Sequence, residues 1–149
     1  MATIKSVREP SLCFNVKLIK NSIKMNPKKN RENAIAFYKT AFEGNPEKAV
    51  ELYVGAGYIQ HNPSVKDGKM GFVEYFNIMQ KEYPEKSVKF VRSAAEGDLV
   101  ALHTHQHWPD KEEYVTMDFF RFDEKGKIVE HWDTIQKIPE SSANDNTMY

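Results

Sequence analysis

The sequence contains too little cysteine, too little net charge and too few long apolar runs for several large classes of protein. Cys13 is the single cysteine among 149 residues, so a disulfide within the chain is excluded and a reducing, cytoplasmic location is expected. Lysine and arginine together number 21, as do aspartate and glutamate, and this balance does not indicate nucleic acid or an anionic membrane as a partner. No apolar run approaches the ~20 residues of a membrane span. Lys17 and Lys20 interrupt the N-terminal segment, so we interpret residues 1–25 as a flexible arm rather than a secretory signal.

The chain also lacks the short motifs of nucleotide-binding and covalent enzymes. Its seven glycines form no phosphate-binding loop. No serine stands in a nucleophile-elbow context, and no cysteine–histidine nucleophile pair is evident. Nucleotide use and covalent catalysis are therefore not indicated.

What the chain does contain is a change of hydrophobic period along its length. Apolar residues recur at helical spacing in three segments before Pro84 and at alternate positions in four segments after it. The expected helices span 30–44, 45–54 and 68–84, with a short strand over 57–65, and the later strands span 86–98, 99–108, 113–123 and 128–138. We expect Asn30 to cap the first helix and Gly44 to end it, and the short turns between the later strands predict an antiparallel meander. This order predicts one α+β domain over residues 26–138, followed by a polar tail over 139–149.

Two stretches carry a resemblance to a known family. "YIQHNP" at 58–63 and "MDFFRFDEKGKIVEHWD" at 117–133 resemble the SnoaL-like branch of the NTF2-like superfamily, over about residues 30 to 138. The resemblance implies a cone in which three helices pack on a curved antiparallel sheet and enclose a deep pocket. It also implies aldol-type cyclisation without a cofactor or a metal, although the same fold carries isomerases, dehydratases and non-catalytic binding domains.

The layout from Tyr38 to Pro63 is also similar to that of ketosteroid isomerases. This resemblance implies that Tyr38 and Asp118 occupy the positions of two oxyanion donors, and that Asn62 occupies the position of the catalytic base. An amide cannot accept a proton at neutral pH, which argues against the isomerase reaction. In the SnoaL-like cyclases a strand aspartate serves as acid and base, and Asp118 is the matching position.

Three of the five histidines stand at alternate positions of one expected strand. Side chains alternate along a strand, so His103, His105 and His107 share a face. If residues 110–111 form the tip of a tight turn, His103 lies opposite Asp118 and faces the pocket. A slip of one residue would turn all three histidines to the other face.

The candidate site follows from this register and from the resemblance. The expected catalytic residues are Asp118, His105, His103 and His131. The expected substrate-binding residues are Tyr38, His61, Asn62, Phe72, Phe76, Phe120 and Asp133. Apolar neighbours in the sequence are expected to raise the pKa of Asp118, which suits a group that takes and returns a proton.

Plainer interpretations remain open for these residues. For the histidines, the alternative is a satisfied pocket side chain without a chemical role. For His131 and Asp133 it is a network that shapes the cavity, and for His61 it is a brace within its loop. Alternate histidines with Asp118 and His131 are a possible zinc-type ligand set, although the resemblance implies a metal-free site.

Three functions are compatible with the sequence. The first is a cofactor-free enzyme that performs acid/base chemistry on a small carbonyl compound. The second is a module that binds a small apolar ligand, and the third is a metal-dependent enzyme built on the histidine strand. Exposed Trp132, Met117 and Phe119 would favour a homodimer through the outer face of the sheet.

Overall fold

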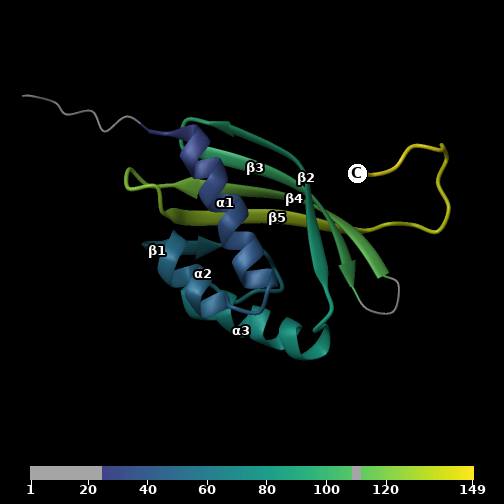
Figure 1. Ribbon diagram of the computed structural model, residues 1–149, viewed down its shortest axis with the longest axis horizontal. Coiled ribbons are helices and arrows are strands. Elements are labelled where there is room, and N and C mark those ends of the chain that lie inside the picture. Colours follow the sequence, from purple (N-terminus) through teal and green to yellow (C-terminus); the bar gives the residue numbers. More distant parts are fainter. Residues whose placement is uncertain (1–24, 109–111) are drawn as a thin grey trace, which may run out of the picture.

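The computed structural model describes residues 25–108 and 112–149. Three helices and five strands follow one another along this part of the chain (Figure 1). The helices are α1 (Pro27–Phe42), α2 (Pro46–Tyr53) and α3 (Gly68–Glu82), and the strands are β1 (Val54–Gln60), β2 (Ser87–Glu96), β3 (Leu99–Trp108), β4 (Glu112–Phe122) and β5 (Ile128–Lys137). The expected N-terminal arm, except for Met25, lies outside the described residues.

The first helix begins one turn earlier than predicted. The side chain of Asn26 accepts a hydrogen bond from the backbone N–H of Lys29 at 3.0 Å, and Pro27 occupies the first helical position. Asn30 is therefore a buried residue inside the helix rather than its cap. Gly44 follows the helix with a φ of 83°, a left-handed conformation that glycine adopts without strain.

The sheet is mixed rather than purely antiparallel. Its strand order is β1-β5-β4-β3-β2, and the four later strands form the predicted antiparallel meander. β1 adds to the free edge of β5 in the parallel direction. This pairing brings the end of β1, and the loop that follows it, next to β5.

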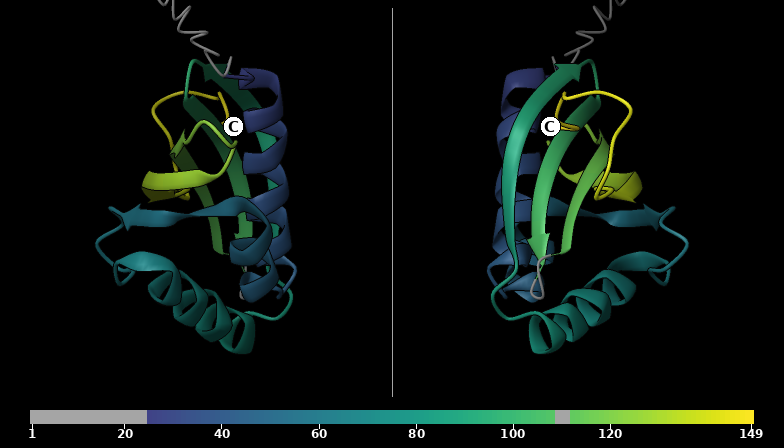
Figure 2. Two further views of the ribbon diagram at one scale, coloured as in Figure 1. Left: turned by 90° about the vertical axis from the view of Figure 1, so that its left-hand side faces the viewer. Right: turned by 90° about the vertical axis from the view of Figure 1, so that its right-hand side faces the viewer.

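The helices cover one face of the sheet, which we call the inner face. Figure 2 shows α1 lying along this face and the C-terminal segment on the opposite, outer face. The core lies where the helices meet the inner face: Phe37 stacks on Phe72 with ring centroids 4.8 Å apart, and its ring lies 6.0 Å from that of Phe120. None of the helices in the described part of the chain is both long and apolar enough to cross a membrane.

The register of β3 against β4 contradicts the prediction. Leu102 lies opposite Asp118, where His103 was expected. The ladder leaves the three residues 109–111 between the two strands, whereas the prediction allowed two residues at the tip. The expected turn itself falls on residues 109–111, outside the described residues. Since side chains alternate along a strand, this difference of one residue turns all three histidines of β3 to the outer face.

Candidate active site

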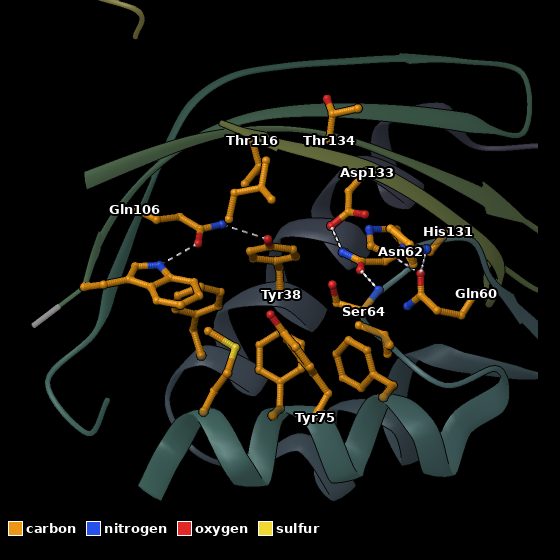
Figure 3. Close-up of a pocket in the computed structure, with 18 residues that line it drawn as sticks. Tyr38, Gln60, Asn62, Ser64, Tyr75, Gln106, Thr116, His131, Asp133 and Thr134 are labelled. Atoms are coloured by element: carbon orange, nitrogen blue, oxygen red, sulfur yellow. Dashed lines mark hydrogen bonds between the residues drawn. The ribbon is translucent and has the colours of Figure 1, made fainter. Parts of the chain in front are cut away.

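A cavity of about 430 Å³ lies between the inner face of the sheet and helices α1 and α3 (Figure 3). This volume is in the usual range for small-molecule sites. Aromatic and aliphatic side chains form most of its wall, with polar groups contributed by the sheet and by the loop after β1. The lining residues are Tyr38, Phe42, Gln60, Asn62, Pro63, Ser64, Val65, Phe72, Tyr75, Phe76, Met79, Gln106, Trp108, Thr116, His131, Asp133, Thr134 and Ile135.

Asp118 lies behind the wall of the cavity rather than in it. The residue is fully buried, and both of its carboxylate oxygens have hydrogen-bond partners. Oδ2 accepts a hydrogen bond from the Thr116 hydroxyl at 2.5 Å, and Oδ1 lies 3.1 Å from Nε2 of His131. Asp118 is therefore placed to orient His131 and is not among the lining residues, which corrects the expectation that it faces the cavity.

His131 lines the cavity and is held from both sides. Its Nδ1 lies 3.1 Å from Oε1 of Gln60, and the same oxygen accepts the backbone N–H of Asn62 at 3.0 Å. Since Gln60 Oε1 can only accept, Nδ1 of His131 carries a proton. A second proton then lies between Nε2 of His131 and Oδ1 of Asp118, in a hydrogen bond that is fully enclosed by the protein.

Asp133 is the acidic residue that faces the cavity. It lies opposite Asp118 in the β4–β5 ladder, on the same face of the sheet. Its Oδ2 accepts a hydrogen bond from the Asn62 side-chain amide at 2.8 Å, while its Oδ1 is buried and has no partner among the described residues. Burial raises the pKa of Asp133, and the charge of Asp118 adds to this, whereas His131 and Asn62 act in the opposite direction.

The loop after β1 fixes the direction in which the Asn62 amide points. The backbone N–H of Ser64 donates to Asn62 Oδ1 at 2.8 Å, which leaves the Nδ2 group to donate to Asp133. Asn62 stands where the isomerase resemblance implied a base. Here it is a hydrogen-bond donor to the carboxylate of a neighbouring strand.

A second polar group lies on the side of the cavity away from Asp133. Gln106 donates from Nε2 to the Tyr38 hydroxyl at 3.0 Å and accepts from Trp108 Nε1 at 3.0 Å. Burial raises the pKa of Tyr38 well above its usual value, and the charges of Asp118 and Asp133 raise it further. The phenol therefore keeps its proton and can donate it in a hydrogen bond.

One group of side chains in the described residues could hold a metal ion. Asp118, His131 and Asp133 offer ligand atoms that lie within 4.8 Å of one another. Both nitrogens of His131 and both oxygens of Asp118 already have hydrogen-bond partners, so a metal would have to displace them. The histidines of β3, which the sequence offered as ligands, lie on the other face of the sheet.

The structure brings together most, but not all, of the predicted site residues. Those that line the cavity are Tyr38, Asn62, Phe72, Phe76, His131 and Asp133. Phe120 lies beneath the cavity, fully buried, with its ring stacked on that of His131 at 4.5 Å.

Three predicted histidines lie outside the cavity. His103 and His105 face outward because of the β3 register, so the prediction that both face the pocket is wrong. His105 stacks on the ring of Tyr149 with centroids 3.7 Å apart, and His103 Nδ1 lies 3.1 Å from a nitrogen of Arg92. His61 was predicted to bind substrate, but it pairs with Glu130 at 2.9 Å on the outer side of β5.

Sequence reasoning missed several polar lining residues. Gln106 lies between His105 and His107 in β3, so its side chain points to the face opposite the histidines. A register that turned the histidines outward would have placed Gln106 in the pocket. Tyr75 stands at helical spacing from Phe72 and Met79, and this periodicity was a usable signal for a pocket residue.

Comparison with known proteins identifies the family and the fold of the chain. The family model of the SnoaL-like domain matches residues 31–131. The chain belongs to the SnoaL-like family. No curated protein sequence matches the chain.

Several solved structures have the same fold as this SnoaL-like protein. TsrD from Streptomyces laurentii superposes with a TM-score of 0.63 at 15% identity, covering 75% of this chain and 91% of its own. A proposed polyketide cyclase from Bacillus cereus superposes with a TM-score of 0.64 at 16% identity, covering 72% of this chain and 74% of its own. A proposed hydroxylase from Streptomyces galilaeus, AclR, superposes with a TM-score of 0.63 at 16% identity, covering 74% and 91% respectively. At these identities the comparison establishes the NTF2-like α+β fold and leaves the chemistry to the site.

Proposed function

We propose that the protein is an acid/base enzyme that acts on a small, uncharged carbonyl compound, without a cofactor. The observation that carries the proposal is the position of Asp133: its carboxylate faces an aromatic cavity of about 430 Å³, beside the buried His131–Asp118 pair. In this proposal Asp133 removes a proton from the carbon next to the ligand's carbonyl group. The electron pair of the broken C–H bond moves toward the carbonyl oxygen, which gives the enolate needed for a cyclase- or isomerase-type reaction.

The surroundings of Asp133 suit a general base. Burial raises the pKa of Asp133, and a carboxylate with a higher pKa is a stronger base. The hydrogen bond from Asn62 holds Oδ2 in place. The neighbouring His131, fixed by Asp118 and Gln60, keeps the sheet side of the site in one arrangement.

The composition of the wall indicates an uncharged ligand. Six of the lining residues are aromatic: Tyr38, Phe42, Phe72, Tyr75, Phe76 and Trp108. Among the described residues that line the cavity there is no lysine or arginine to pair with a carboxylate or a phosphate. An anionic ligand would therefore meet Asp133 without compensation, and its binding would be unfavourable.

The proposal takes limited support from the solved structures. The proposed polyketide cyclases among them suggest carbonyl chemistry, but AclR is a proposed hydroxylase on the same fold. The chemistry is therefore argued from Asp133 and its neighbours, not from the fold.

Exchange of α-protons for deuterium tests the proposal without knowledge of the natural substrate. A panel of small ketones, including α-tetralone, is incubated with the protein in D₂O, and loss of the α-proton signal is followed by NMR. We expect the native protein to accelerate exchange and Asp133→Asn to abolish the acceleration. Asp145→Asn, which makes the same change in the exposed C-terminal tail, serves as the matched control. Equal exchange by the native protein and by Asp133→Asn would contradict the proposal.

A non-catalytic binding module is the second candidate. It is favoured by the hydrogen bonds that already occupy both nitrogens of His131 and both oxygens of Asp118. In that case the ketones bind, as followed by the fluorescence of the lining residue Trp108, and no exchange occurs.

A further inference from the structure

Tyr75 supplies a hydroxyl group to the cavity from the helical side. Residues at helical spacing on α3 face the hollow, among them Phe72, Tyr75 and Phe76. In Figure 3 the Tyr75 side chain rises from α3 and its hydroxyl points into the cavity, toward the sheet that carries Asp133. The two residues therefore lie on opposite walls of the same hollow.

The hydroxyl of Tyr75 is free to bind a ligand. It makes no hydrogen bond with any described residue, whereas the two buried tyrosines on this side of the sheet are engaged. The Tyr38 hydroxyl accepts from Gln106 at 3.0 Å, and the Tyr58 hydroxyl accepts from Gln60 at 2.9 Å. Free polar groups in an apolar cavity are the groups that orient a ligand.

The protonation state of Tyr75 suits a donor. Burial raises its pKa above the usual value for a phenol, and the charge of Asp133 raises it further. The phenol therefore carries its proton at neutral pH and can donate to an oxygen but not accept a proton as a base.

Proton removal at a carbon next to a carbonyl group needs such a donor on the other side of the ligand. As the C–H bond breaks, negative charge develops on the carbonyl oxygen, and a preorganised donor stabilises that charge. Asp133 reaches the ligand from the sheet and Tyr75 reaches it from α3. A flat carbonyl compound lying between the two walls can therefore contact both groups at once.

We propose that the Tyr75 hydroxyl donates the hydrogen bond that receives the ligand's carbonyl oxygen, opposite the base Asp133. This inference rests on the proposed function. The α-proton passes to Asp133, the electron pair of the C–H bond becomes the new C=C bond, and the resulting oxyanion stays hydrogen-bonded to Tyr75. The loss of one such donor lowers turnover by about 10²–10³-fold in well-studied cases.

The conservative variant Tyr75→Phe separates this role from packing. It keeps the ring, which lies 5.5 Å from that of Phe76 in an edge-on arrangement, and removes only the hydroxyl. Tyr53→Phe is the matched control, because Tyr53 packs against the core but does not line the cavity. Tyr38→Phe removes the other tyrosine hydroxyl that lines the cavity and is compared with Tyr75→Phe.

The measurement is the infrared carbonyl band of bound α-tetralone labelled with ¹³C at the carbonyl carbon. A hydrogen bond to the oxygen lowers the stretching frequency. We expect the band of the bound ketone to return toward its unbonded frequency in Tyr75→Phe and to stay unchanged in Tyr53→Phe. A band that is unchanged in Tyr75→Phe, or that moves only in Tyr38→Phe, would overturn the assignment of Tyr75.

The α-proton exchange assay distinguishes the two proposals. We expect Tyr75→Phe to slow exchange by about 10²-fold, with the larger change in kcat rather than KM. A Tyr75-dependent band without exchange by the native protein would leave Tyr75 as the carbonyl anchor of a binding module and refute the enzymatic proposal. Failure of the ketone to bind the native protein would overturn both.

Discussion

Substituting Gly71 tests how the loop after β1 is held against α3. A Cβ atom at position 71 would lie 1.9 Å from the carbonyl oxygen of Lys66 and 2.5 Å from its carbonyl carbon, where side-chain carbons essentially never come closer than 3.0 Å. Both atoms belong to the backbone, so the contact cannot be relieved by a change of rotamer. The loop or α3 must move by about 1 Å to relieve this contact, and the same loop carries Asn62, whose side chain donates to Asp133 at 2.8 Å.

The expected cost of Gly71→Ala is large for so small a change. Overpacking costs about 1–3 kcal/mol, and loss of a hydrogen bond to a charged group adds about 1.5–3 kcal/mol. The higher helix propensity of alanine returns about 1 kcal/mol. We therefore expect the free energy of unfolding to fall by about 1.5–5 kcal/mol, and Tm by roughly 3–20 °C for a chain of this length.

Denaturation by urea, with Gly57→Ala as the control, measures this effect. A Cβ at Gly57 meets no atom within 4 Å, so that variant should stay within about 1 kcal/mol of the native protein. Gly71→Ala should also weaken ketone binding, because it displaces the loop that lines the cavity. If the two alanine variants have the same stability, the close approach of Lys66 to α3 is not a constraint and the reasoning fails.

Three further predictions concern the charges of the site. Burial raises the pKa of Asp133, so its contribution to stability is present in acid and is lost as the pH rises through that pKa. At neutral pH, Asp133→Asn should therefore unfold at a higher urea concentration than the native protein. In acid this difference should vanish. Asn62→Ala removes a donor to the ionised carboxylate and should move the acid limb of the pH–exchange profile to higher pH, whereas Asn77→Ala, which breaks a 2.7 Å bond to the exposed Glu47, should leave the profile in place. His105→Ala should leave ketone exchange unchanged, because its imidazole lies on the outer face; a loss of exchange comparable to that of Asp133→Asn would contradict the observed register.

Hydrophobic period predicted the elements better than it predicted their ends or partners. The α+β order, the three helices and the four-stranded meander were predicted from the spacing of apolar residues. This spacing is informative because each element buries the face on which its apolar residues recur. The start of α1 was wrong because both Asn26 and Asn30 satisfy the preference for a cap, and the deciding signal was Pro27 in the first turn. The parallel pairing of β1 with β5 joins segments far apart in the sequence, and local spacing contains no information on that choice.

The β3–β4 register depended on one residue of turn length. Alternation in β3 is compatible with either face, since Val100 and Leu102 are apolar on one side and the histidines carry a carbon-rich ring on the other. The structure buries Thr104 and Gln106 on the inner face, two polar residues whose places there depend on hydrogen bonds to other buried groups. A pattern of apolar residues cannot reveal such positions, because the compensating partners come from other strands and from α1.

Hydrogen-bond partners from other strands also explain why the resemblance pointed to Asp118 and Asp133 but not to which of the two lines the cavity. Asp118 and Asp133 lie opposite each other in the β4–β5 ladder, so both side chains point to the same face of the sheet. Asp118 is fully buried, and its two oxygens are engaged by Thr116 and His131, whereas Asp133 lines the cavity and keeps one oxygen without a partner among the described residues. Which carboxylate meets a ligand is therefore decided by depth and by hydrogen-bond partners, quantities that exist only after the sheet has formed.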